Sequence, residues 1–167
     1  ERTQVDPRAN PWAMLASLPL FSGLPKSIID AAVAELEWIA LPGGDPLFES
    51  GAPADSVYFV VSGCLGAFGP GGELVGRIAA GESVGEMGLI AARPRAATVR
   101  ALRDSELARL SSGTFERVLL SHPEAILRLA RLSVERLESI RTRGQVPAAP
   151  RTITVIPHDP AVDLAPL

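Results

Sequence analysis

The sequence predicts a mainly β domain with flanking helices, built as an antiparallel sandwich or barrel. Between residues 37 and 110, short runs rich in β-forming residues alternate with turn sequences that contain glycine or proline. About seven or eight strands at this spacing are typical of antiparallel β architectures. On both sides of this region, apolar residues recur every three or four positions, which indicates helices.

The composition is that of a folded globular chain, with 47% hydrophobic and 21% charged residues. No apolar run approaches the roughly 20 residues that span a bilayer, and no secretory signal opens the chain. The net charge of −3 argues against nonspecific nucleic-acid binding as the main role. The single cysteine, Cys64, cannot form an internal disulfide and fits a cytoplasmic protein. The chain starts at Glu1, so we expect a piece of a longer protein.

The N-terminal region predicts two helices after an irregular lead-in. Residues 1–11 are polar, contain two prolines and have no periodicity. Residues 12–18 predict a short helix, and residues 25–36 a longer one with Pro25 at its start. The apolar face of the longer helix is expected to lie on the sheet and holds Ile28, Ile29, Ala32, Val33 and Leu36.

The strands follow in short runs that turn sequences separate. Glycines stand in the turns, where a positive φ or a close backbone approach is least costly: Gly43, Gly44, Gly51, Gly63, Gly71 and Gly72. The predicted strands cover residues 37–41, 46–50, 56–61, 64–68, 73–80, 96–102 and 105–110.

Helices return at Ser112. After a short amphipathic turn, the run from Ser121 to Glu124 predicts a capping box, and the helix it opens is expected to end near Arg143. Its apolar stripe is wide enough to contact two surfaces. Residues 126, 130, 133, 137 and 140 have the spacing of a weak dimer seam. The helix also carries several arginines, which a solvated face explains by default and a membrane-surface or partner contact explains as the alternative.

The organisation is therefore one domain over residues 12–143. Residues 144–167 predict a linker followed by the start of another domain. Residues 145–150 have linker composition, and residues 152–157 form one β-like run that has no partner strand.

The candidate site is the stretch GESVGEMGLIAARPRAATVRAL, residues 81–102. Gly85 opens a short helix whose first amides suit a phosphate oxygen. Glu86 can accept hydrogen bonds from two vicinal sugar hydroxyls, although a glutamate that complements a helix dipole is the plainer alternative. Arg95 can place its guanidinium on a phosphate, with a solvated loop arginine as the alternative.

The surroundings of Arg95 favour the ligand interpretation. Pro94 fixes its approach, and the small side chains of Ala96 and Ala97 leave space beside it. One arginine facing one helix start suits a single phosphate. A triphosphate would need a GxxxxGK[ST] loop and a metal, and the sequence has no such loop and no metal motif.

This stretch resembles the phosphate-binding cassette of the cyclic nucleotide-binding domain family, which typically reads FGE, a short loop and PRAATV. Here it reads VGEMGLIAARPRAATV, with Val84 in place of the phenylalanine. The resemblance extends over about residues 15–140. It implies an eight-stranded antiparallel jelly-roll β-barrel with N-terminal helices and a long C-terminal helix.

The resemblance also implies roles for the site residues. Glu86 would bind the ribose 2′-hydroxyl and Arg95 the cyclic phosphate. Gly85, Met87 and Ala96 would contribute backbone contacts around the ring. Ala97, which follows Ala96, is a further ligand-binding candidate. Ala96 stands where a threonine favours cyclic GMP, so cyclic AMP is the expected ligand. The base would be covered from the last helix, with Leu129 and Leu132 as candidates.

Further stretches resemble patatin-like phospholipases of the neuropathy target esterase kind, namely LPLFSGLP, RDSELARL and RTITVIPHDP. This implies the regulatory part of a lipid hydrolase whose catalytic domain follows Leu167 and which associates with membranes when full-length. The alternative is the sensor of a catabolite-activator-type regulator. That class needs a helix-turn-helix after the long helix, and the residues from Gly144 onward have no such pattern.

Residues 81–85 also match GxSxG, the nucleophile elbow of serine hydrolases, with Ser83 as the nucleophile. That motif needs a parallel sheet and a histidine base. The flanking pattern is antiparallel, and only His122 and His158 are available. We therefore interpret the match as chance and predict that this chain is not itself an enzyme.

Overall fold

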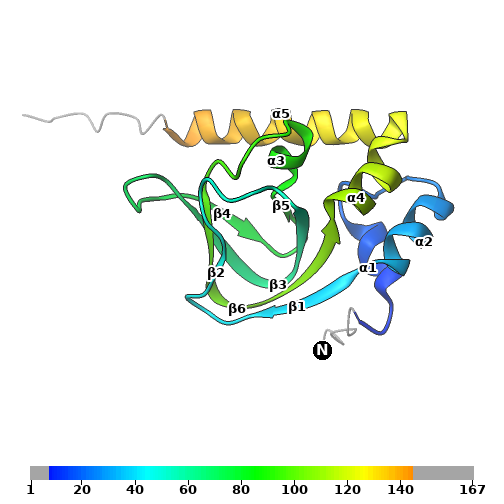
Figure 1. Ribbon diagram of the computed structural model, residues 1–167, viewed down its shortest axis with the longest axis horizontal. Helices are drawn as coiled ribbons and strands as arrows, with labels where there is room; N and C mark the ends of the chain where they lie inside the picture. The colour runs from blue at the N-terminus through cyan, green and yellow to red at the C-terminus, as the bar shows by residue number, and fades with distance from the viewer. Residues whose placement is uncertain (1–7, 145–167) are drawn as a thin grey trace, which may run out of the picture.

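A computed structural model describes residues 8–144 of the chain. One curved antiparallel sheet forms the body of the molecule, short helices lie at one end of it, and the long last helix extends along one side (Figure 1). Two short helices come first, α1 (Pro11–Ser17) and α2 (Lys26–Ala34), as the sequence predicted. The side chain of Asn10 caps α1 by accepting a hydrogen bond from the amide of Ala13, at 2.9 Å. Pro25 stands directly before α2.

Six strands form the sheet, and every described pairing is antiparallel. Four of them follow the order β1-β6-β3-β4, while β2 pairs with β6 and β5 pairs with β3. Their bounds are β1 Glu37–Leu41, β2 Pro46–Phe48, β3 Ser56–Phe68, β4 Leu74–Ala79, β5 Ser83–Val84 and β6 Thr98–Ser111.

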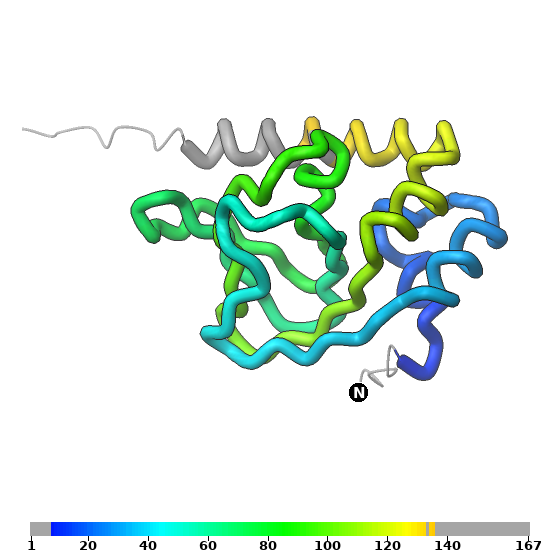
Figure 2. Tube along the Cα trace, in the orientation of Figure 1, coloured from blue at the N-terminus to red at the C-terminus, as the bar shows by residue number. Residues whose placement is uncertain are grey.

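The closed eight-stranded barrel expected from the resemblance is not what these strands form. Within residues 8–144 the sheet is open, because β1 pairs only with β6 and β4 only with β3. The strand count differs because two pairs of predicted strands are continuous and because the short β5 was not predicted. Residues 56–61 and 64–68 lie in β3, and residues 96–102 and 105–110 lie mostly in β6. Figure 2 shows both long strands following the curve of the sheet.

Gly63 explains why a turn signal inside β3 does not end the strand. It has a φ of +94°, and a Cβ there would lie 2.2 Å from the Ser105 hydroxyl of the neighbouring strand. The register between β3 and β6 shifts across Gly63, between Ser62 and Cys64, and also just before and just after this pair of residues. The glycine therefore forms an irregularity that bends a continuous strand, since a bulge absorbs one residue without breaking the ladder.

Apolar residues pack on both faces of β3 and form two clusters. Val57 and Phe59 face the helical end, where Phe59 meets Phe21 edge-on at 5.4 Å between ring centroids. Tyr58 and Val60 face the opposite cluster, inside the curve of the sheet. Because alternate residues point to opposite faces, β3 is the wall that separates the helical core from the interior of the sheet.

Three helical segments complete the described chain: α4 (Ser112–Phe115), the π-helical turn η1 (Glu116–Leu120) and α5 (Pro123–Gly144). The predicted capping box is wrong, because α5 begins at Pro123 and the Ser121 hydroxyl instead donates to the carbonyl of Glu116 at 3.3 Å. The end of α5 agrees with the sequence. Within residues 8–144, no helix is long and apolar enough to cross a membrane.

One flank of α5 is buried and another is exposed. Ala125 and Leu129 belong to the helical core, whereas Ile126, Leu127 and Val134 are 46%, 54% and 54% exposed. The second contact surface expected for the wide stripe is therefore open to solvent at these three positions. The side chains at 133, 137 and 140 of the predicted dimer seam lie outside the described residues, as do residues 145–167 of the predicted linker and following domain.

Candidate ligand-binding site

The predicted site folds as β5, then α3 (Glu86–Ile90), then a loop that leads into β6. Gly85 joins β5 to α3 with a φ of +92°, in the left-handed region. A Cβ at this position would lie 2.4 Å from Nη1 of Arg95 and 3.2 Å from the carbonyl of Ser56. Only glycine satisfies both the backbone conformation and the close approach of the guanidinium.

Arg95 is buried, with its side chain only 2% exposed. Nη1 donates to the carbonyl of Gly85 at 2.9 Å, and Nη2 donates to the carbonyl of Ser56 at 2.7 Å. The guanidinium lies over the ring of Phe48, with 4.3 Å between Cζ and the ring centroid. Backbone carbonyls and an aromatic face thus hold the cation in one place.

The hydrogen bonds of Arg95 leave its Nε unused. Nε is buried and has no hydrogen-bond partner among residues 8–144. An unpaired buried donor costs about 1–3 kcal/mol, and more when the group is charged. An acceptor from outside these residues would remove this cost by pairing with Nε.

A cavity of about 460 Å³ lies against Arg95, which is a size that suits a small-molecule ligand. Glu86, which is 5% exposed, lies in its wall as well. The structure therefore brings the carboxylate of Glu86 and the guanidinium of Arg95 to the same cavity. The six residues predicted to contact the ribose and phosphate all line this cavity: Gly85, Glu86, Met87, Arg95, Ala96 and Ala97.

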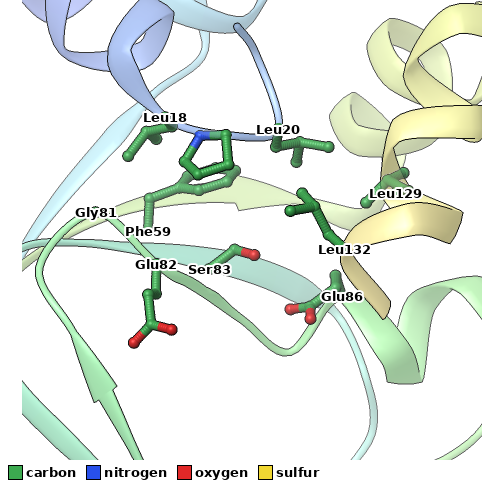
Figure 3. Close-up of a pocket in the computed structure, with 10 residues that line it drawn as sticks. Leu18, Leu20, Phe59, Gly81, Glu82, Ser83, Glu86, Leu129 and Leu132 are labelled. Carbon is green, nitrogen blue, oxygen red and sulfur yellow. The ribbon is translucent and has the colours of Figure 1, made fainter. Parts of the chain in front are cut away.

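The two base-capping candidates lie elsewhere. Leu129 and Leu132 of α5 line a second, smaller pocket together with Leu18 and Phe59, and Figure 3 shows their side chains beside Glu86. Neither leucine lines the large cavity. Glu86 and Glu82 border both pockets, and of the two only Glu86 is buried, so it is the buried side chain between the cavity and the underside of α5.

The acidic partner of Arg95 and the arginine beside it were not predicted from the sequence. Asp55 Oδ1 lies 3.4 Å from Arg95 Nη2, and Asp55 Oδ2 lies 3.7 Å from Nη2 of a second arginine, Arg109. Arg109 also pairs with Glu37 at 2.7 Å. The hydrogen bond to Glu37 is the main cause that raises the pKa of Arg109 above its ordinary value, against partial burial that lowers it. The only signal for this contact in the sequence was the position of Asp55, an acidic residue directly before a buried strand.

The described residues do not provide the parallel sheet that the nucleophile-elbow alternative needs. Ser83 lies in β5, which pairs antiparallel with β3, and no described strand pairing is parallel. His122 is exposed at the start of α5, and His158 lies outside the described residues. Across residues 8–144, no three His, Cys, Asp or Glu side chains form a group that could hold a metal ion.

Comparison with protein families gives one match to this region. The model of the "Cyclic nucleotide-binding domain" family matches residues 38–122. The matched residues include all of β1 except Glu37, the strands β2 to β6 and the whole of the predicted cassette.

Curated relatives match over most of the chain. An NTE family protein of Mycobacterium tuberculosis is 32% identical over 142 residues, which are 85% of this chain and 24% of the relative. Patatin-like phospholipase domain-containing protein 6 of Pongo abelii is 30% identical over 166 residues, which are 95% of this chain and 12% of the relative. The chain thus spans a quarter or less of the length of these relatives.

Solved structures share the fold. The regulatory domain of Toxoplasma gondii PKA, crystallised with cAMP, superposes with a TM-score of 0.68 at 26% identity and covers 77% of this chain and 50% of its own. The catabolite activator protein of Thermus thermophilus superposes with a TM-score of 0.64 at 29% identity, with 75% and 61% covered.

Proposed function

The chain belongs to the cyclic nucleotide-binding domain family, and we propose that it binds cyclic AMP as the regulatory module of a larger lipid hydrolase. It is homologous to the corresponding region of the neuropathy target esterase and patatin-like phospholipase relatives. The proposal adds the ligand, the residues that bind it and the output to this family membership.

The buried guanidinium of Arg95 is the observation that carries the ligand proposal. A buried cation needs compensating negative charge, and its nearest described carboxylate, Asp55, lies 3.4 Å away and is itself 66% exposed. A phosphate in the cavity would accept a hydrogen bond from Nε and supply that charge. Glu86, in the wall of the same cavity, would accept from the ribose 2′-hydroxyl.

The preference for cyclic AMP rests on Ala96. Its methyl group lines the cavity directly after Arg95 and offers no hydrogen bond to the exocyclic amine of guanine. The other lining residues near it are Ala97 and Val99, which are apolar as well. A site without a partner for that amine gives cyclic GMP no advantage over cyclic AMP.

Glu86 supports a route from the ligand to the output. Its carboxylate borders both the large cavity and the pocket under α5, which Leu129 and Leu132 line. A ligand that draws Glu86 toward the ribose would change the support of α5, and the helix would close toward the base. Such a shift requires that the ligand binds one helix position better than the other.

The proposed output is a hydrolase domain beyond Leu167, because the likeness to patatin-like phospholipase domain-containing protein 6 covers 95% of the chain. Phospholipid ester hydrolysis by the full-length protein, with and without cyclic AMP, tests this. The likeness to a catabolite activator favours a sensor for transcription as the second candidate. Sequence-specific DNA binding that responds to cyclic AMP, without lipid hydrolysis, would favour that candidate.

Calorimetry with cyclic AMP and cyclic GMP tests the site. We expect Arg95→Ala to weaken cyclic AMP binding about tenfold or more, because it removes a charged hydrogen-bond donor from a buried position. Arg93→Ala is the matched control, since it removes an exposed arginine from the same loop. Equal binding by wild type and Arg95→Ala would contradict the proposed site.

A further inference from the structure

A second arginine lies behind the site and outside the cavity. Arg109 of β6 stands opposite Glu37 of β1 and opposite Tyr58 of β3 in the sheet. Its side chain is 25% exposed and does not line the cavity. Its contacts nevertheless converge on the two residues that hold Arg95.

Ser56 connects the two arginines. Its backbone carbonyl accepts a hydrogen bond from Arg95 Nη2 at 2.7 Å, and its side-chain hydroxyl accepts one from Arg109 Nε at 2.7 Å. Ser56 is fully buried. Arg109 therefore fixes the residue whose carbonyl determines where the Arg95 guanidinium lies.

Asp55 is shared by the same two cations. Its two carboxylate oxygens lie 3.4 Å from Arg95 Nη2 and 3.7 Å from Arg109 Nη2. Without Arg109, this carboxylate would act on Arg95 alone and would reduce the positive potential that an anionic ligand meets. The effect is larger at Arg95 than at the surface, because a buried charge is screened less.

We propose that Arg109 is a positioning residue that sets the affinity of the site for an anionic ligand by holding Ser56 and by offsetting the charge of Asp55. The inference rests on the proposed function, because it concerns the same phosphate at Arg95. A cross-strand pair of Arg109 with Glu37 that serves only the stability of the sheet is the competing explanation.

The test compares Arg109→Gln, Arg109→Lys and a control, Arg103→Gln. Arg103 is an exposed arginine of the same strand, and its Nη2 donates to the carbonyl of Gly63 rather than to a residue of the site. Its replacement by glutamine changes the net charge by the same amount. Cyclic AMP affinity is measured by calorimetry. For a partly exposed charge we expect Arg109→Gln to weaken binding about three- to fivefold. Arg109→Lys, which keeps the charge, and Arg103→Gln should stay within about twofold of wild type.

A spectroscopic signal separates positioning from stability. The Nε–H resonance of Arg95 in ¹⁵N spectra, taken without ligand, should move in Arg109→Gln, return toward its wild-type position in Arg109→Lys and stay in place in Arg103→Gln. An unmoved signal in Arg109→Gln, or wild-type affinity in that variant, overturns the inference. Failure of the wild type to bind cyclic AMP or cyclic GMP would instead reject the proposed function, while the Arg95 signal still decides whether Arg109 positions it.

Discussion

The two pockets that meet at Glu86 differ in what holds them together. The large cavity is built on a buried cation, with Arg95 fixed by two backbone carbonyls and an aromatic ring. The small pocket under α5 has mainly apolar walls, with Leu18, Phe59 and Leu129 around it. Directional contacts define one position for a ligand, whereas apolar packing tolerates a small movement of a helix. The first pocket is suited to recognition and the second to response.

Gly85→Ala should damage the large cavity most. The alanine would have to keep a left-handed φ of +92°, and its methyl group would lie 2.4 Å from Arg95 Nη1. We therefore expect the free energy of unfolding to fall by about 3 kcal/mol or more. Cyclic AMP binding should be lost with it. Thermal unfolding and calorimetry measure the two effects.

Gly81→Ala is the matched control for this change. Gly81 has a φ of +91°, but a Cβ there meets no atom within 4 Å. It should therefore show only the conformational cost of about 1–2 kcal/mol and should keep its ligand affinity. Equal effects of the two substitutions would mean that the contact with Arg95 does not matter.

Local chemistry explains which parts the sequence predicted. Gly85, Glu86 and Arg95 lie within one short stretch whose residue types restrict the backbone, so their meeting at one cavity followed from the order of the residues. Asp55 and Arg109 come from distant strands, and their pairing depends on a register that bulges near Gly63 displace. The division of β3 into two predicted strands was wrong because a glycine that ends a strand and one that bends it look alike in a sequence.

Phe48→Leu should have a smaller effect on the same pocket. It removes the ring under the Arg95 guanidinium while it keeps an apolar side chain, and a cation–π contact at a shielded site contributes about 1–2 kcal/mol. Because this contact is present without ligand, we expect cyclic AMP affinity in calorimetry to fall by at most about that amount, through a less well positioned guanidinium. Phe68→Leu, a half-buried phenylalanine of β3, is the control. Unchanged affinity in Phe48→Leu would show that the carbonyls alone hold the guanidinium.

The smallest expected effect concerns the connection between the pockets. Leu129 and Leu132 lie beside Glu86, so their methyl resonances should shift when cyclic AMP binds. Glu86→Gln keeps the shape of the side chain and removes its charge, which weakens its hydrogen bond to a ribose hydroxyl. In that variant, saturating cyclic AMP should move the methyl signals of Leu129 and Leu132 less than in wild type.

The exposed Leu127 of the same helix is the internal control and should barely respond. Equal shifts in wild type and Glu86→Gln would mean that α5 senses the ligand by a path that does not include Glu86, such as the neighbouring Glu82, which lines both pockets as well. The proposed link through Glu86 between a recognition pocket and a response pocket would then fail.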